Sequence, residues 1–118
     1  MLSRTENVAV LELSPKQIRI LENIAKHGFA IVAFPLYASA AGVRNGNCAA
    51  LLAPIPNGGM RLVSEPCWLL NGNLSVRIRK NNIEWFVWKK QEVEATPDRL
   101  AEVAEFRSEL EDLLAAKA

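Results

Sequence analysis

The chain has 118 residues, of which 50% are hydrophobic and 23% are charged, and its formal net charge is +1. This length suits one domain with a single hydrophobic core, and the composition excludes a disordered chain. The near-neutral charge gives no overall electrostatic preference for nucleic acid or for an anionic membrane surface.

The first helix is predicted to begin at Ser14. Ser14 is a typical N-cap, Pro15 suits the first helical position, and Gln17 completes an S-x-x-Q capping box. Gly28 suits the left-handed residue that ends a helix. The apolar stripe expected to face the core consists of Ile18, Leu21, Ile24 and Ala25. Before this helix we expect a polar start without a secretory signal, and then a short strand or an apolar lead-in at residues 8–13.

An uncharged segment follows the helix. Residues 29–34 are continuously apolar, which predicts a strand covered on both faces in the inner part of a sheet. Pro35 ends that strand or places it next to a sheet edge, and residues 36–43 are compatible with either a helical turn or a strand of small residues. The uncharged segment is shorter than the ~20 residues of a membrane-spanning helix, so we predict no contact with the membrane interior.

Short strands then alternate with turn residues. Residues 44–47 form a turn, residues 48–53 an apolar strand, and residues 54–59 a loop whose Asn-Gly pair indicates a hairpin. Two more strand segments follow, at 60–63 and 67–70, before another Asn-Gly turn. Strands at such even spacing favour an antiparallel meander.

The segment from Leu74 to Lys90 is predicted to be a β-hairpin. Its turn falls at Asn81-Asn82, because asparagine tolerates the positive φ of a two-residue turn. Residues that face each other across the hairpin share one face of the sheet. The entirely apolar face, which we predict to be core, consists of Leu74, Val76, Ile78, Trp85 and Val87. The opposite face is basic and aromatic, and it consists of Ser75, Arg77, Arg79, Glu84, Phe86 and Trp88.

The second helix is predicted to start at Thr96. Thr96 is the N-cap, Pro97 is the first helical residue, and Asp98 meets the positive end of the helix dipole. Its apolar stripe consists of Leu100, Val103, Phe106, Leu110 and Leu113. We therefore predict a single α+β domain over 1–118, with about five antiparallel strands packed against an N-terminal helix and a longer C-terminal helix.

The residue types of common active sites are sparse. The one histidine, His27, lies at a predicted helix end, where it suits the helix dipole. Cys48 and Cys67 lack CxxC spacing, so we expect two reduced, buried thiols, with a disulfide between neighbouring strands as the alternative. The glycine pattern of a phosphate-binding loop is absent from the sequence. We predict no catalytic residues, no cofactor and no metal ligands.

The basic and aromatic hairpin face requires a cover, and the second helix is the natural candidate. Residues 1–96 carry 11 Lys+Arg against 7 Asp+Glu, whereas residues 97–118 carry 3 against 6. This opposite charge suits packing of the helix on the hairpin, either within one chain or across a two-fold axis. The candidate interaction surface consists of Arg77, Arg79, Phe86, Trp88 and Phe106.

The preferred hypothesis is a small, soluble, cytoplasmic, non-enzymatic module for protein–protein interaction. We expect it to form a homodimer with Trp88 and Phe106 at or near the interface. One alternative is nucleic-acid or polyanion binding through the hairpin, which the lack of a basic excess disfavours. The other is a small-molecule-binding or enzymatic domain with a pocket near Tyr37 and Arg44, lined also by Ser39 and the tryptophans.

Overall fold

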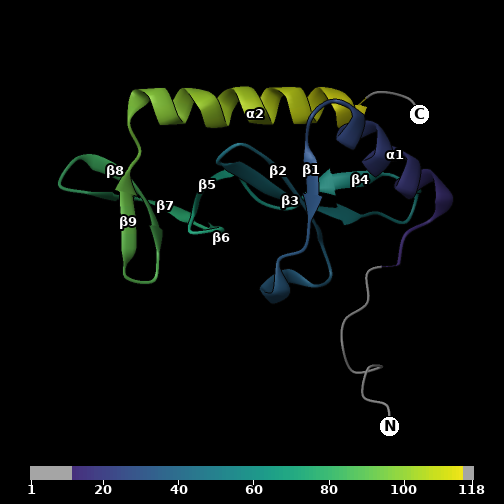
Figure 1. Cartoon of the computed structure of the whole chain (residues 1–118), viewed down its shortest axis with the longest axis horizontal. Coiled ribbons are helices and arrows are strands. Elements are labelled where there is room, and N and C mark those ends of the chain that lie inside the picture. The colour runs from purple at the N-terminus through teal and green to yellow at the C-terminus, as the bar shows by residue number, and fades with distance from the viewer. Residues whose placement is uncertain (1–11, 116–118) are drawn as a thin grey trace, which may run out of the picture.

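A computed structural model describes residues 12–115 of the chain, so the expected lead-in at residues 8–11 lies outside the described part. Within this part the chain is an α+β structure with antiparallel strands, as predicted. The helix α2 runs along one side of the strands, with α1 near one of its ends (Figure 1). The elements are α1 (Pro15–Lys26), β1 (Ala30–Val32), a 3-10 helix (Pro35–Tyr37), β2 (Ala41–Asn45), β3 (Cys48–Pro54), β4 (Met60–Leu62), β5 (Cys67–Leu70), β6 (Asn73–Leu74), β7 (Val76–Lys80), β8 (Ile83–Trp88), β9 (Gln91–Glu94) and α2 (Pro97–Ala115).

Helix α1 begins and ends as the sequence predicts. Ser14 and Gln17 form both hydrogen bonds of the capping box, and Gly28 has a φ of +96° just after the helix. The predicted stripe is only partly correct. Leu21 and Ile24 are buried, whereas Ile18 is 45% exposed, and Gln17 takes its place on the buried side.

The buried amide of Gln17 has a second set of partners. Its Nε2 donates to the carbonyl oxygens of Ile55 and Gly59, at 3.1 and 3.0 Å. Both carbonyls belong to the loop between β3 and β4. Because a buried polar group needs hydrogen-bond partners, this amide joins the start of α1 to that loop.

The larger sheet has the order β1-β2-β3-β5-β6, with β4 paired to β3. The turns of this sheet lie at the Gly and Asn residues where the sequence predicts them, and Gly46, Asn71 and Gly72 have positive φ. Residues 36–43, for which the sequence allows either a helical turn or a strand, contribute to both the 3-10 helix and β2. The prediction that residues 29–34 are covered on both faces is wrong. In the described chain β1 is an edge strand that pairs only with β2, and Ile31 is 42% exposed.

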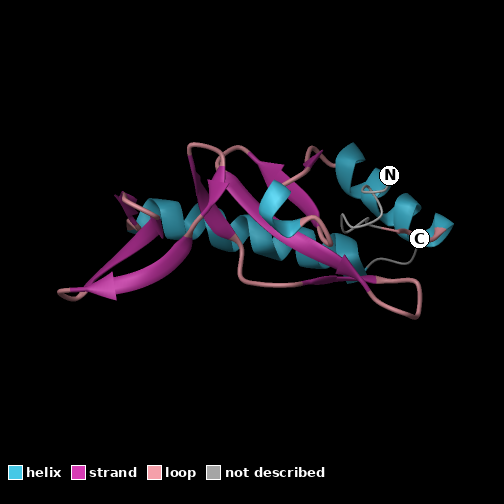
Figure 2. Ribbon diagram, turned by 90° about the horizontal axis from the view of Figure 1, so that it is seen from below, coloured by secondary structure: helices cyan, strands magenta, loops and turns pink. Residues whose placement is uncertain are grey.

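One face of the larger sheet packs on both helices. The register places alternate residues of β2, β3 and β4 on this face, and they are buried against α1 and α2. The main contributors are Ala41, Val43, Cys48, Ala50, Leu52 and Met60 from the sheet with Val103, Phe106 and Leu110 from α2. The ring of Phe106 packs against Phe29, with centroids 5.4 Å apart. The apolar stripe predicted for α2 is therefore covered by its own chain, and seen from below, the strands form one layer in front of the helix (Figure 2).

The hairpin forms a separate small sheet, β7-β8-β9, rather than part of one five-stranded sheet. Its register is the predicted one, from Val76 opposite Val87 to Arg79 opposite Glu84, and Asn81 and Asn82 have φ of +52° and +65°.

The predicted core face of the hairpin is wrong. Val76 is 63% exposed and Ile78 38% exposed, whereas Phe86 on the opposite face is 1% exposed. The physical reason is Trp68 of β5, whose ring stacks on Phe86 with centroids 6.4 Å apart. The cover of Phe86 therefore includes a neighbouring strand, a partner that the sequence analysis did not consider.

Candidate functional site

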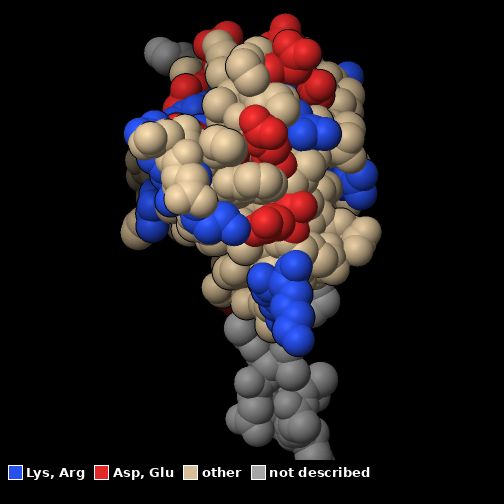
Figure 3. All heavy atoms as spheres, turned by 90° about the vertical axis from the view of Figure 1, so that its left-hand side faces the viewer, with Lys and Arg blue, Asp and Glu red and all other residues tan. Residues whose placement is uncertain are grey.

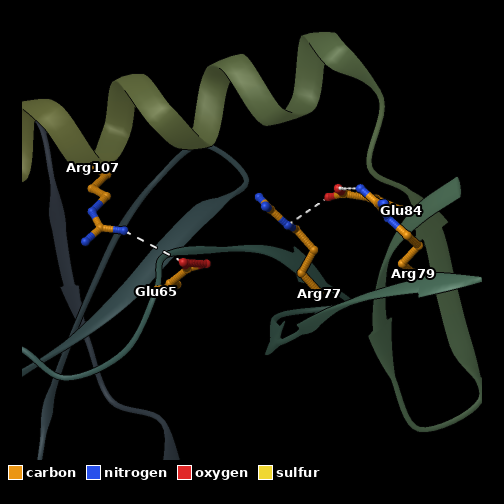
Figure 4. A network of polar contacts seen from close by, with 5 residues as sticks. All are labelled: Glu65, Arg77, Arg79, Glu84 and Arg107. Carbon is orange, nitrogen blue, oxygen red and sulfur yellow. Dashed lines mark hydrogen bonds and ion pairs between the residues drawn. The ribbon is translucent and has the colours of Figure 1, made fainter. Parts of the chain in front are cut away.

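The two arginines of the predicted interaction surface share one carboxylate. Arg77 Nε lies 2.9 Å from Glu84 Oε1, and Arg79 Nη2 donates to Glu84 Oε2 at 3.0 Å. Figure 4 shows both side chains turned toward Glu84, with a second pair between Arg107 of α2 and Glu65 at 4.0 Å nearby. These ion pairs occupy the arginines within the chain, so this face offers a polyanion less free positive charge than the sequence suggested.

Only two of the three aromatic members of the predicted surface, Phe86 and Trp88, share a face of the small sheet. Phe86 is buried against Trp68, and Phe106 is buried against Phe29 on the helix-covered side of the larger sheet. Trp88 is half-buried, and the ammonium of Lys89 lies 5.1 Å from its ring centroid. The structure thus brings Arg77, Arg79, Phe86 and Trp88 onto one face of the small sheet but places Phe106 in the chain's own core.

The outward face of the small sheet is apolar and largely uncovered. We name it the hairpin face, and it consists of Val76, Ile78, Ile83, Trp85 and Val87. Val76, Ile78 and Ile83 are all exposed, and Trp85 and Val87 are half-buried. Two carboxylates of β9, Glu92 and Glu94, border it, because they pair with Val87 and Trp85. The alternation of the sequence identified four of these residues, Val76, Ile78, Trp85 and Val87, although it assigned them to the core and did not include Ile83.

A lysine crosses the hairpin face. Lys80 Nζ lies 5.3 Å from the centroid of the Trp85 ring and 2.8 Å from Glu92 Oε1. The alkyl stem of Lys80 therefore covers part of the Trp85 ring, while its ammonium group pairs with Glu92 of β9.

Charges of both signs surround this end of the molecule. Acidic side chains gather at the top of the view, where α2 lies, and basic side chains gather at the lower tip (Figure 3). The turn between β8 and β9 contributes Lys89 and Lys90. No single charge sign therefore dominates this end as a whole.

A cavity of about 210 Å³ lies on the side of the larger sheet opposite α1 and α2; we name it the Arg44 pocket. Arg44, Tyr37 and Trp88 all line it, as the alternative hypothesis for a pocket expected, whereas Ser39, Trp68 and Trp85 do not. Arg44 Nη2 donates to the carbonyl oxygen of Gly46 at 3.0 Å. The other lining residues are Val32, Ala33, Phe34, Leu36, Leu69, Gly72, Asn73 and Leu74. No acidic side chain is among them.

Both cysteines are free and buried, as predicted. They lie on neighbouring strands, but the register pairs Cys48 with Trp68 and Ala49 with Cys67, so the two thiols point to opposite faces of the sheet. Burial raises the pKa of Cys48 to about 11, with a smaller contribution from Glu102, and burial also raises the pKa of Cys67. Raised pKa values keep both thiols protonated at neutral pH, so neither is an activated nucleophile.

Other sites of chemistry are few. Within residues 12–115 no three His, Cys, Asp or Glu side chains are grouped to hold a metal ion, and no helix is long and apolar enough to cross a membrane. The His27 ring nitrogen Nδ1 lies 2.8 Å from the carbonyl oxygen of Asn23 at the end of α1, which agrees with its predicted place there. Comparison with known proteins yields no match to a family model, a curated protein or a solved structure. The hairpin face and the Arg44 pocket are therefore the features on which a function can be argued.

Proposed function

We propose that this protein is a non-enzymatic interaction module that forms a homodimer through the hairpin face. The observation that carries the proposal is the exposure of Val76, Ile78 and Ile83 beside half-buried Trp85 on one face of the small sheet. Soluble monomers rarely leave contiguous apolar faces of this kind in water. A second copy of the chain supplies a matching apolar face.

The charges around the hairpin face favour a symmetric pair. Lys80 lies at the end of β7, and Glu92 and Glu94 lie on β9, with β8 between them. A two-fold axis parallel to β8 sets β7 of one copy against β9 of the other, which brings Lys80 toward the partner's carboxylates. Among the described residues the Glu94 carboxylate has no ion pair, so it is available for this contact.

Pairing through the outer edge of β7 is a less favourable route to the same dimer. That edge carries Arg77, Arg79 and Lys80, and antiparallel pairing of two such edges brings like charges together. The face of the small sheet, rather than its edge, is therefore the proposed contact.

We also propose a cytoplasmic location. The support is the pair of free thiols, which the sheet holds on opposite faces and which suit a reducing compartment.

The test of the dimer is the mass of the protein in light scattering at micromolar concentration. We expect the wild-type chain to have twice the chain mass and the Ile78→Glu variant to have the chain mass with an unchanged circular dichroism spectrum. Ile31→Glu is the matched control, because Ile31 is a similarly exposed isoleucine on a strand of the other sheet, and it should remain dimeric. A monomeric wild type contradicts the proposal, as does an Ile78→Glu variant that still dimerises.

A further inference from the structure

The Arg44 pocket combines one cation with apolar walls. Arg44 is an exposed residue, and its hydrogen bond to the Gly46 carbonyl uses one nitrogen of the guanidinium. Among residues 12–115 no acidic side chain pairs with Arg44, and none lines the pocket. The remaining guanidinium N–H groups are therefore free to bind an anion, for which the planar fork of arginine suits a carboxylate.

The walls of the pocket are aromatic and aliphatic. Tyr37, Phe34 and Trp88 come from two separate parts of the fold, and Leu69 and Leu74 come from β5 and β6. The ammonium of Lys89 over the Trp88 ring adds positive charge beside the pocket. A simple inorganic anion would leave these walls without a partner, whereas an acid with an apolar group satisfies both the walls and the cation.

Gly42 allows Phe34, which lines the pocket, to pack closely on β2. A Cβ at this position would lie 2.5 Å from Phe34 Cδ2 and 2.6 Å from the Val32 carbonyl oxygen. The absence of a side chain thus lets the Phe34 ring lie directly on β2, next to the pocket. The place of the Phe34 ring at the pocket therefore depends on glycine at position 42.

We propose that the Arg44 pocket binds a small carboxylic acid that carries one aromatic or branched apolar group. The carboxylate pairs with Arg44, and the apolar group lies between Tyr37 and Trp88. The volume of about 210 Å³ is below the ~300–1,000 Å³ of sites for drug-sized ligands, which limits the apolar group to about one ring.

The probe for this proposal is phenylacetate, with phenylacetamide as its uncharged counterpart of nearly equal shape. Two-dimensional ¹H–¹⁵N NMR of the full chain follows the indole N–H of Trp88 and the backbone amides of Tyr37 and Arg44 during each titration. We expect saturable shifts with phenylacetate and a roughly tenfold weaker affinity for phenylacetamide, because the amide loses the charge-assisted pair. Inorganic phosphate at equal concentration should leave the Trp88 signal in place.

The variant for this test is Arg44→Gln, which should bind phenylacetate no better than the wild type binds phenylacetamide. Arg61→Gln is the matched control, because Arg61 is an exposed arginine on the same side of the sheet that does not line the pocket. Equal affinity for the acid and the amide, or unchanged binding in Arg44→Gln, overturns the proposal. So does the absence of saturable shifts at the pocket residues in the wild type.

The proposal for the pocket and the proposal for the dimer can be contradicted independently of each other. Trp88 lies on the side of the small sheet opposite the hairpin face. The Ile78→Glu variant should therefore still bind phenylacetate whether or not the wild type dimerises.

Discussion

The ammonium of Lys80 lies 5.3 Å from the centre of the Trp85 ring and is held there by an ion pair of 2.8 Å with Glu92. Glu92 is two strands away from Lys80 in the small sheet, so the lysine must extend across β8 to reach it. This contact explains why Trp85 is half-buried on a face whose neighbours Val76 and Ile78 are exposed.

The Lys80 contact predicts the effect of Glu92→Gln. Loss of the ion pair releases the lysine, so the Trp85 indole becomes more accessible to acrylamide, and its ¹H–¹⁵N signal moves. The free energy of unfolding should change by less than about 1 kcal/mol, because exposed ion pairs contribute little. Measurement at a protein concentration low enough for the chain to be monomeric removes any cover by a second copy.

The control for this prediction is Glu94→Gln. Glu94 lies on the same strand and borders the same face, but no described residue pairs with its carboxylate. The Glu94→Gln variant should therefore show the same acrylamide quenching of Trp85 as its parent. If Glu92→Gln and Glu94→Gln behave alike, the lysine does not cover the tryptophan.

The two faces of the hairpin predict different costs for truncation. Phe86→Ala should lower the free energy of unfolding by about 3–5 kcal/mol, because it leaves a cavity under Trp68. Ile78→Ala should cost less than about 1 kcal/mol in dilute monomer, since that side chain is already 38% exposed.

Urea unfolding at several protein concentrations measures both values. If the hairpin face forms the dimer, only the Ile78→Ala cost should grow with protein concentration, because only that residue would be buried on association. A larger cost for Ile78→Ala than for Phe86→Ala at low concentration would show that the faces are assigned wrongly.

The hairpin shows what sequence patterns can and cannot determine. Asn81-Asn82 fixes the turn, and the turn fixes every opposite pair from Arg79 to Val76, so the register was predictable. Alternation then sorts the residues into two faces but does not say which face is covered. That depends on Trp68, a residue distant in the sequence whose ring happens to meet Phe86.

The starts of both helices and the end of α1 were predictable because they carry local signals. Ser14 with Gln17 and Thr96 with Pro97 define the starts, and the structure confirms both. The burial of β1 was not predictable in the same way. Its continuous apolar pattern is shared by inner strands and short edge strands, and only the pairing of distant segments distinguishes them. The pocket hypothesis placed Arg44 near the tryptophans, but which tryptophan lines the pocket depends on how the two sheets meet.

Gln17 predicts an unusually large effect for a polar side chain. Gln17→Ala removes one cap interaction and two hydrogen bonds to the Ile55 and Gly59 carbonyls, in a site that is 5% exposed. We expect the free energy of unfolding to fall by about 2–4 kcal/mol in urea denaturation.

Ser14→Ala provides the comparison for Gln17, because it removes a cap acceptor but leaves the amide bonds to the loop in place. Its expected cost is about 1 kcal/mol. Equal costs for the two variants would mean that the bonds to the loop contribute nothing to stability.

The buried thiol of Cys48 predicts how stability depends on high pH. Its pKa is raised from 9.0 to about 11 by burial and by Glu102, so the folded chain keeps the thiol proton at a pH where the unfolded chain has lost it. The sign follows directly: below pH 9.0 the thiol is neutral in both states and has no effect, and between 9.0 and about 11 rising pH favours unfolding. The expected loss is on the order of 1–3 kcal/mol. Urea unfolding across this range should show a shallower pH slope for Cys48→Ala than for the wild type, whatever the variant's cost at neutral pH. Identical slopes would show that Cys48 ionises as readily in the folded chain as in the unfolded one.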